Sequence, residues 1–286
     1  MSWQILVGLS VLLYSINGLL HRVLMRNDKS DPKTQAFIFT CLVGFFGVLI
    51  AQYQGGIRSG LTAQQMPSFL AIAVLITLGS VYAFKGFKYI EASEHTILLT
   101  TAKLWSFFGA VFLLGETLTT WKILAAMLII MGVVIAEWRK QRFQLNIGAV
   151  YVLIAAICYA SGEVLSFLTL QNFDSTAFLI YGSFLSAVII AITSPGIFSN
   201  LSFYKQHNNL ANIMIVSIND TLATLFLFNA YQIGRNALQI GPIMGTQTIV
   251  TVILAYIFLR ENDHMLQKIV GALLAMGGTI LLLGQS

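Results

Sequence analysis

Long apolar stretches alternate with short polar connections along the whole chain. A membrane-spanning helix needs about 20 mostly apolar residues, because each residue adds about 1.5 Å across about 30 Å of hydrocarbon. Only helices and closed barrels pair every backbone polar group in lipid, so we expect an all-α membrane protein. The pattern predicts ten transmembrane helices, at residues 3–24, 35–54, 67–89, 93–114, 119–138, 146–170, 175–194, 211–233, 237–259 and 265–284.

The composition supports a polytopic membrane protein. Of the residues, 57% are hydrophobic and 9% are charged, whereas a soluble domain carries about 25% charged residues. The net charge of +5 is spread over short connections, which does not indicate a nucleic-acid partner. The first apolar run has no basic residue before Arg22 and continues without a small-residue cleavage pattern, so we interpret it as a retained helix and not a signal peptide.

The two halves of the chain repeat at a constant shift of 145 residues. This shift aligns Glu116 with Glu261 and Tyr14 with Tyr159, and it also matches Gly132 with Gly277 and several apolar residues. Each half then holds five helices, and because five is odd the second half must enter the membrane from the opposite side. We therefore predict two inverted repeats, residues 1–143 and 144–286, around a central cavity, which is the plan of many secondary transporters.

Two segments of the repeat resemble a known family. The fourth helix is followed by LGET, the ninth by LREN, and a Gly-rich helix comes after each. With the five-plus-five arrangement, this resembles EamA-type permeases of the drug/metabolite transporter superfamily, over nearly the whole chain. The resemblance implies a basket-shaped bundle that carries small metabolites. Counting the ten predicted helices in chain order, its cavity is lined chiefly by helices 1, 3, 4, 6, 8 and 9, with helices 5 and 10 at the periphery. LREN departs from the family pattern, which usually has a Gly before the Glu.

The most conspicuous polar residue of the predicted bundle is Lys103, near the centre of the fourth helix. A charge at that depth costs at least about 2.5–3.5 kcal/mol, so it faces protein or a water-filled cavity. Thr96 and Thr100 precede it at helical spacing on the same face. Two interpretations stay open, namely a structural ion pair with a neighbouring helix and a group that binds a ligand.

Two carboxylates lie within predicted helices. Asp220 is near the middle of the eighth helix, and Glu163 lies past the centre of the sixth. Opposite charges near the midplane suit a zwitterion such as an amino acid, although they would equally suit each other as an ion pair. Both acids are candidates for proton coupling. The predicted substrate-binding residues are Tyr14, Asn17, Thr100, Lys103, Trp105, Tyr159, Glu163, Asp220, Thr224, Gln247 and Thr248.

The sequence carries no recognisable catalytic or metal-binding motif. The chain has no nucleophile elbow, zinc-protease motif or phosphate-binding loop, and His21, His95, His207 and His264 lack metal-ligand spacing. We therefore expect no enzyme activity, no metal and no cofactor, and we interpret His21 as a polar residue near the interface.

The predicted function is a secondary active transporter of a small polar metabolite, amino-acid-like or zwitterionic, working by alternating access. One alternative is a transporter of an anionic or phosphorylated metabolite, and another is a non-transporting scaffold or a lipid-modifying enzyme. We expect a multi-pass protein of the bacterial inner membrane, with a small-molecule substrate, the lipid bilayer and a coupled proton or counter-substrate as partners. Small residues in helices 5 and 10 fit close packing within a monomer or a homodimer.

The orientation of the chain stays open. Of the 16 Lys and Arg residues, 11 lie in the odd-numbered connections or at the helix ends beside them, and 3 lie in or beside the other connections and the termini. The positive-inside rule then places both termini outside. The family resemblance implies termini in the cytoplasm, so the two arguments disagree.

Overall fold

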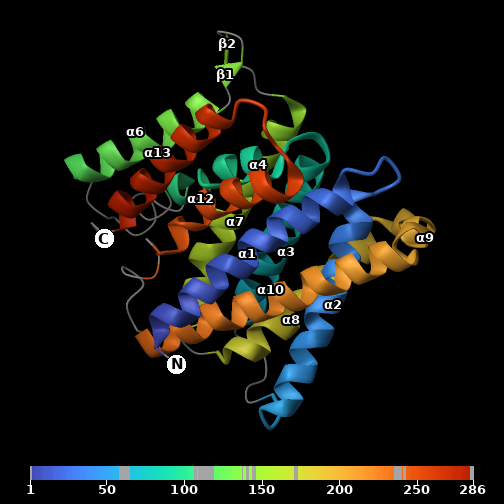
Figure 1. The fold of residues 1–286 in the computed structure, drawn as a ribbon. Coiled ribbons are helices and arrows are strands. Elements are labelled where there is room, and N and C mark those ends of the chain that lie inside the picture. The colour runs from blue at the N-terminus through green and yellow to red at the C-terminus, as the bar shows by residue number, and fades with distance from the viewer. Residues whose placement is uncertain are drawn as a thin grey trace.

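The protein is a bundle of helices with one short hairpin (Figure 1). The computed structural model describes residues 2–57, 65–105, 108, 119–136, 138–139, 142–143, 146–170, 173–234, 240 and 243–283. Within these residues seven helices are long and apolar enough to cross a membrane, and Thr120–Ala136 and Ile243–Leu259 are shorter apolar helices. The all-helical membrane class is confirmed. The count of ten stays a prediction, because much of the expected helix 93–114 falls outside the described residues.

The helix bounds agree with the expected ranges to within a few residues at most ends. The first half contains α1 (Trp3–Met25), α2 (Pro32–Tyr53), α3 (Met66–Tyr89), α4 (Ala92–Leu99) and α6 (Thr120–Ala136). The hairpin β1 (Trp138–Arg139) and β2 (Arg142–Phe143) leads to the second half. That half contains α7 (Ile147–Leu170), α8 (Ser175–Thr193), η1 (Pro195–Asn200), α9 (Leu201–Tyr204), α10 (His207–Gly234), α12 (Gln247–Leu254), η2 (Ala255–Leu259) and α13 (Met265–Leu283).

Acidic caps start the second helix of each half. The Asp31 side chain accepts a hydrogen bond from the backbone N–H of Thr34, and Pro32 occupies the first turn of α2. In the same way, Asp174 accepts from the backbone N–H of Ala177 at the start of α8. A cap pairs one of the otherwise unsatisfied N–H groups of the first turn, and Pro fits there because its missing N–H is not needed.

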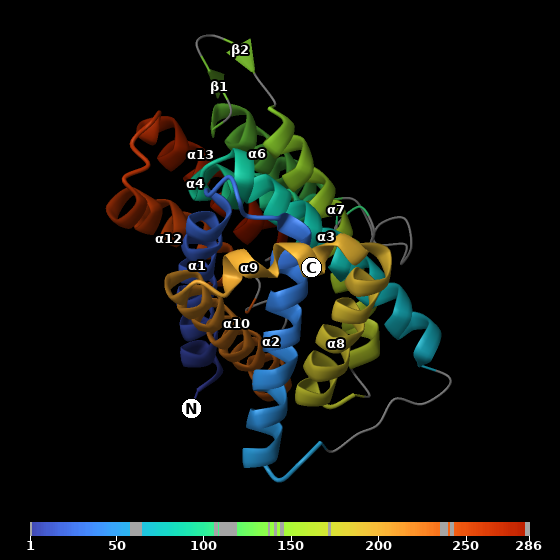
Figure 2. The same cartoon turned by 90° about the vertical axis from the view of Figure 1, so that its right-hand side faces the viewer.

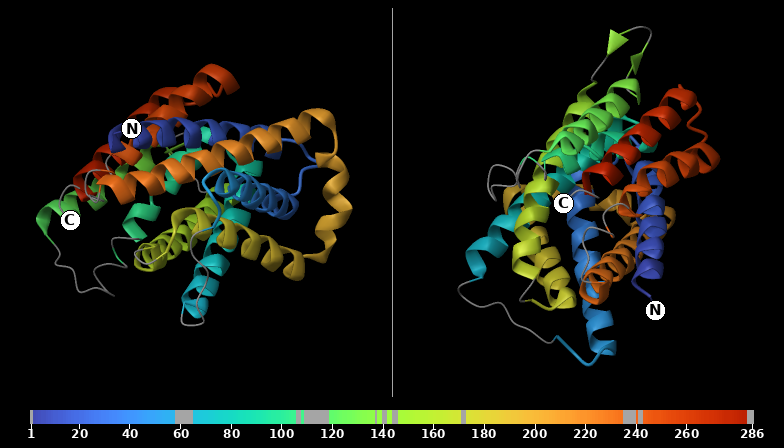
Figure 3. Two further views of the ribbon diagram at one scale, coloured as in Figure 1. Left: turned by 90° about the horizontal axis from the view of Figure 1, so that it is seen from below. Right: turned by 90° about the vertical axis from the view of Figure 1, so that its left-hand side faces the viewer.

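The closest helix pairs join the two halves of the chain. In Figures 1, 2 and 3, α1 lies beside α10, and α6 lies beside α13. Helix α3 packs on α7 in the same manner, and α2 packs on α8. Under the repeat, α1 corresponds to α7 and α10 to α3, so the α1–α10 pair is equivalent to the α7–α3 pair. This exchange of neighbours is the arrangement that a two-fold repeat produces, while the inversion across the membrane stays a prediction.

Glycines let α6 and α13 approach closely. A Cβ atom added at Gly132 would lie 2.5 Å from the carbonyl oxygen of Gly271, and one at Gly271 would lie 2.6 Å from that of Gly132. Gly277, the repeat equivalent of Gly132, has no heavy atom within 4 Å of its added Cβ. The contact therefore depends on Gly132 and Gly271, small residues of the kind that let helices approach closely in membranes, and it is made within one chain. A second protomer is not needed for it, and the oligomeric state stays a prediction.

We expect Gly132→Ala to lower the melting temperature of the purified protein. The added methyl must displace backbone of α13, and such overpacking costs about 1–3 kcal/mol. The matched control is Gly277→Ala, where the methyl meets open space and Ala gains about 1 kcal/mol of helix propensity. Thermal unfolding in detergent should rank Gly277→Ala at or above wild type and Gly132→Ala below it. Equal melting temperatures for the two variants would contradict the proposed close packing.

Candidate functional site

A cavity of about 450 Å³ lies in the middle of the bundle. Its walls come from α1, α2, α3, α4, α7, α8, α10 and α12, and no described residue of α6 or α13 lines it. That peripheral place for α6 and α13 agrees with the family resemblance. The contribution of α2 and α8 to the cavity wall was not expected. It follows from the packing of these two helices on each other and on α10 and α3. The volume falls within the range of small-molecule sites, about 300–1,000 Å³.

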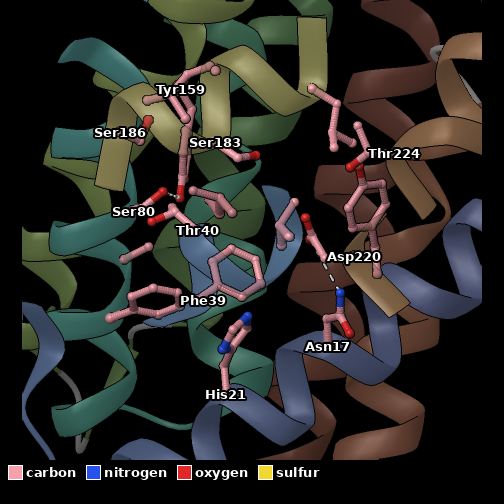
Figure 4. Close-up of a pocket in the computed structure, with 18 of the residues that line it drawn as sticks. Asn17, His21, Phe39, Thr40, Ser80, Tyr159, Ser183, Ser186, Asp220 and Thr224 are labelled. Atoms are coloured by element: carbon pink, nitrogen blue, oxygen red, sulfur yellow. Dashed lines mark hydrogen bonds between the residues drawn. The ribbon is translucent and has the colours of Figure 1, made fainter. Parts of the chain in front are cut away.

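The cavity is mostly apolar, with a few polar groups (Figure 4). Asp220 is the one Asp, Glu, Lys or Arg among the described lining residues. Hydroxyl groups come from helices of both halves, among them Thr40, Ser80 and Ser183. The aromatic part of the wall consists of Tyr14, Phe39, Phe69, Phe84, Phe87, Tyr159, Phe178 and Phe228. An apolar cavity with a few directed polar groups is typical of a site that binds a small organic molecule.

Asp220 and Asn17 form the main polar contact of the cavity. The Nδ2 of Asn17, on α1, donates to the Oδ1 of Asp220, on α10, across 3.3 Å, and Figure 4 shows both side chains at the wall. Asn17 is 3% exposed, and its Oδ1 has no hydrogen-bond partner in the described chain. The side-by-side packing of α1 and α10 brings these two residues together from positions 203 apart in the sequence. Acceptor atoms therefore dominate this part of the site.

The two tyrosines matched by the repeat make similar contacts. The hydroxyl of Tyr14 lies 2.7 Å from the Oγ1 of Thr224 on α10. The hydroxyl of Tyr159, on α7, donates to the Oγ of Ser80 on α3 across 3.2 Å. Both tyrosines line the cavity, and each links a helix of one half to a helix of the other. The Tyr match found in the sequence thus corresponds to a repeated structural contact.

Lys103 and Glu163 form an ion pair that is not part of the cavity lining. The Nζ of Lys103 lies 2.9 Å from both carboxylate oxygens of Glu163. The two side chains are 30% and 50% exposed. Of the two interpretations that the sequence left open for Lys103, this geometry favours the ion pair.

A break in the helix explains why Lys103 does not follow Thr96 into the cavity. Regular helix ends at Leu99, and the backbone N–H groups of Thr101 and Lys103 bond to carbonyls three residues earlier. The hydroxyls of Thr100 and Thr101 bond to nearby carbonyls of the same segment. A turn of three residues rotates the following side chains away from the face that a period of 3.6 predicts. Thr96 lines the cavity, whereas Thr100 and Lys103 do not.

Of the other residues predicted for the site, some line the cavity and some do not. Gln247 lines the cavity, together with Tyr14, Asn17, Tyr159, Asp220 and Thr224. Thr248 is buried elsewhere in α12, and Trp105 is exposed with its ring near that of Phe108. Neither is among the lining residues.

The cavity is also lined by two histidines, His21 and His95, which the sequence analysis did not assign to the site. His21 was expected near the interface, but it is buried and points into the cavity (Figure 4). The signal was present, because Tyr14, Asn17 and His21 share one face of α1 at spacings of three and four. His95 begins the apolar run of the fourth helix and carried no such signal.

The connection between η2 and α13 contacts the start of α4. The carboxylate of Glu261 accepts from the backbone N–H of Ala92 at 2.9 Å and from both the N–H and the hydroxyl of Ser93. The fully buried ammonium of Lys268 pairs with Glu91. A carboxylate at a helix N-terminus pairs orphan N–H groups and complements the helix dipole. The second-half Glu of the repeat therefore caps a first-half helix. Its counterpart Glu116 lies outside the described residues.

The comparisons with known proteins agree with this architecture. The model of the EamA-like transporter family matches residues 1–138 and, separately, residues 146–284. A solved structure, described only as the crystal structure of a protein, superposes with a TM-score of 0.59 at 12% sequence identity. The superposition covers 98% of this chain and 95% of that structure's chain, which shows a common fold. No curated protein matches the chain in sequence. Two family matches that together span nearly the whole chain, on a bundle of membrane-spanning helices, establish that the protein belongs to the EamA-like transporter family and is a multi-pass membrane transporter of the drug/metabolite transporter type.

Proposed function

We propose that the protein is a secondary active transporter of a small organic amine, which it binds in the central cavity. The observation that carries this proposal is the Asn17–Asp220 pair, which places a carboxylate and a buried amide oxygen without a hydrogen-bond partner at the wall of an otherwise apolar and aromatic cavity, within the described residues. An ammonium group has three donors and no acceptor, so it matches a carboxylate and an amide oxygen. Aromatic ring faces add attraction for a cation, and they accommodate the apolar part of the ligand.

The membrane environment strengthens this argument. A carboxylate held away from water is costly unless it is paired or protonated. Asn17 supplies one neutral hydrogen bond to Asp220, and no Lys or Arg is among the described residues that line the cavity. A positively charged ligand would complete the pairing. A proton would do so equally, which makes Asp220 our candidate for coupling, since amine and proton would compete for the same carboxylate.

The other substrate classes receive less support from this arrangement. A zwitterion or a phosphorylated metabolite needs a cation in the site, and Lys103, the expected one, is paired with Glu163 outside the cavity lining. Glu163 is a weaker coupling candidate for the same reason. The amine of an amino-acid-like metabolite would still fit Asp220. No observation favours a scaffold or a lipid-modifying enzyme.

We propose alternating access as the mechanism. Three of the helix pairs that join the halves, α1–α10, α3–α7 and α2–α8, surround the cavity, so rocking of one repeat against the other would expose it to each side in turn. The Glu261 cap and the Lys268–Glu91 pair tie the halves together at the start of α4, and we assign them to the closed end of the pathway. Exchange with protons needs an energised membrane, for which the family resemblance suggests the bacterial inner membrane.

We expect Asp220→Asn to reduce binding and transport of amines by at least about ten-fold, because a hydrogen bond to a charged group contributes about 1.5–3 kcal/mol. The measurement is uptake of labelled 3-methylbutylamine into proteoliposomes, with binding in detergent as a second readout. The matched control is Asp28→Asn, because Asp28 is exposed in a connection and does not line the cavity. Full transport by a folded Asp220→Asn protein would refute the assigned role of the carboxylate.

The Lys103–Glu163 pair allows a double-mutant test. We expect Lys103→Gln and Glu163→Gln each to lower the melting temperature, because each removes one charge of the ion pair and leaves the other. The double variant should recover most of the lost stability, since residues in direct contact are energetically coupled. It should also transport 3-methylbutylamine at close to the wild-type rate. A stable double variant without transport would instead place the pair in the binding site.

A further inference from the structure

A second cavity, of about 380 Å³, lies at the end of the bundle where α1 finishes and α4 begins. The connection from η2 to α13 forms one of its sides (Figure 1). Three arginines line it, namely Arg22 and Arg26 at the end of α1 and Arg260 in that connection. No described residue lines both this cavity and the central one, so the proposed transport site does not account for these charges.

The acidic groups that line this cavity do not neutralise the arginines. Glu91 pairs with Lys268, and Glu261 accepts hydrogen bonds from the start of α4. Among the described residues, none of the three arginines forms an ion pair. With the Glu91–Lys268 pair neutral, the three arginines are opposed by Glu261 and Asp263, so the cavity has an excess of one positive charge.

The backbone holds the arginines in this cavity at some cost. Arg22 and Arg26 are four residues apart at the end of a helix, a spacing at which like charges are neighbours and destabilise the helix. Arg260 has a φ of 54°, in the left-handed region that residues other than glycine rarely adopt. A guanidinium N–H of Arg22 donates to the carbonyl oxygen of Phe87, which fixes that side chain at the wall. A bound anion would offset the repulsion, and a strained residue in a cavity is typical of a functional site.

The surroundings of the cavity favour a lipid as the source of that anion. Arg22 and Arg26 lie at the end of a membrane-spanning helix, which is the level of the lipid headgroups. Phe258 and Leu266, on either side of the η2–α13 connection, are 70% and 76% exposed, and Val23 of the cavity lining is exposed as well. In a multi-pass membrane protein such apolar side chains contact acyl chains. A phospholipid lying along them would have its headgroup beside the arginines.

We propose that Arg22, Arg26 and Arg260 bind the phosphate group of an anionic phospholipid headgroup. A guanidinium is planar and its paired N–H donors match two phosphate oxygens, and basic pockets between membrane helices suit anionic headgroups. A headgroup with one net negative charge, such as that of phosphatidylglycerol, matches the single excess positive charge, whereas phosphatidylcholine carries no net charge. A soluble phosphate ester offers the same oxygens without acyl chains. The site is independent of the proposed amine site in the central cavity.

The test is native mass spectrometry of the purified full-length protein in detergent. The protein is titrated with phosphatidylglycerol, with phosphatidylcholine of the same acyl chains, and with glycerol 3-phosphate. The test variant combines Arg26→Gln with Arg260→Asn, because Asn is among the residues that tolerate the left-handed conformation. The matched control combines Lys29→Gln with Lys33→Gln, which removes two exposed cations from the same end of the bundle that do not line the cavity.

We expect wild-type protein to bind phosphatidylglycerol at least about ten-fold more tightly than phosphatidylcholine, and the arginine variant to lose at least about ten-fold in that affinity. The lysine control should bind like wild type. Equal losses in both double variants would show general attraction to surface charge and overturn the proposal. Equally tight binding of glycerol 3-phosphate would make a soluble phosphate ester the ligand and overturn the lipid assignment. No preference of the wild type for phosphatidylglycerol would overturn the proposal without any variant having to fold.

Discussion

A carboxylate within a membrane-embedded, apolar cavity is stable only when something pairs it, and Asp220 is held in such a place. Its hydrogen bond from Asn17 exists because α1 and α10, from different halves of the chain, pack side by side. The same packing, repeated by α3 and α7, sets the other walls of the cavity and the two tyrosine contacts. The site is therefore a property of the joined halves, and neither half contains it alone.

Several other charged side chains of the bundle have structural partners. Lys103 pairs with Glu163, Lys268 pairs with Glu91, and Glu261 caps the start of α4. These contacts neutralise charge at the sides and one end of the bundle, so Asp220 remains as the charged group that faces the cavity among the described residues. Helices α6 and α13 take no part in that lining, and their glycines are used for close packing instead. Polar chemistry and helix association are thus assigned to different pairs of helices.

The sequence by itself determined most of the helices, their approximate bounds and the family, and it predicted the five-plus-five repeat. These features depend on local hydrophobicity, on caps such as Asp31 and Asp174, and on matches at one shift. All of them follow from the order of residues along the chain. It also identified the polar face of α1, because that helix is regular and its period of 3.6 holds from Tyr14 to His21.

Tertiary structure decided which polar residues share the cavity. The helical period failed between Thr96 and Lys103, because two threonines tighten the backbone there and rotate the side chains that follow. The ion pairs join residues far apart in sequence, as do the contacts of Glu261, and no local pattern selects among the available partners. The contacts of His21 with Gln35, and of Gln35 with Tyr204, join helices that only the folded bundle brings together.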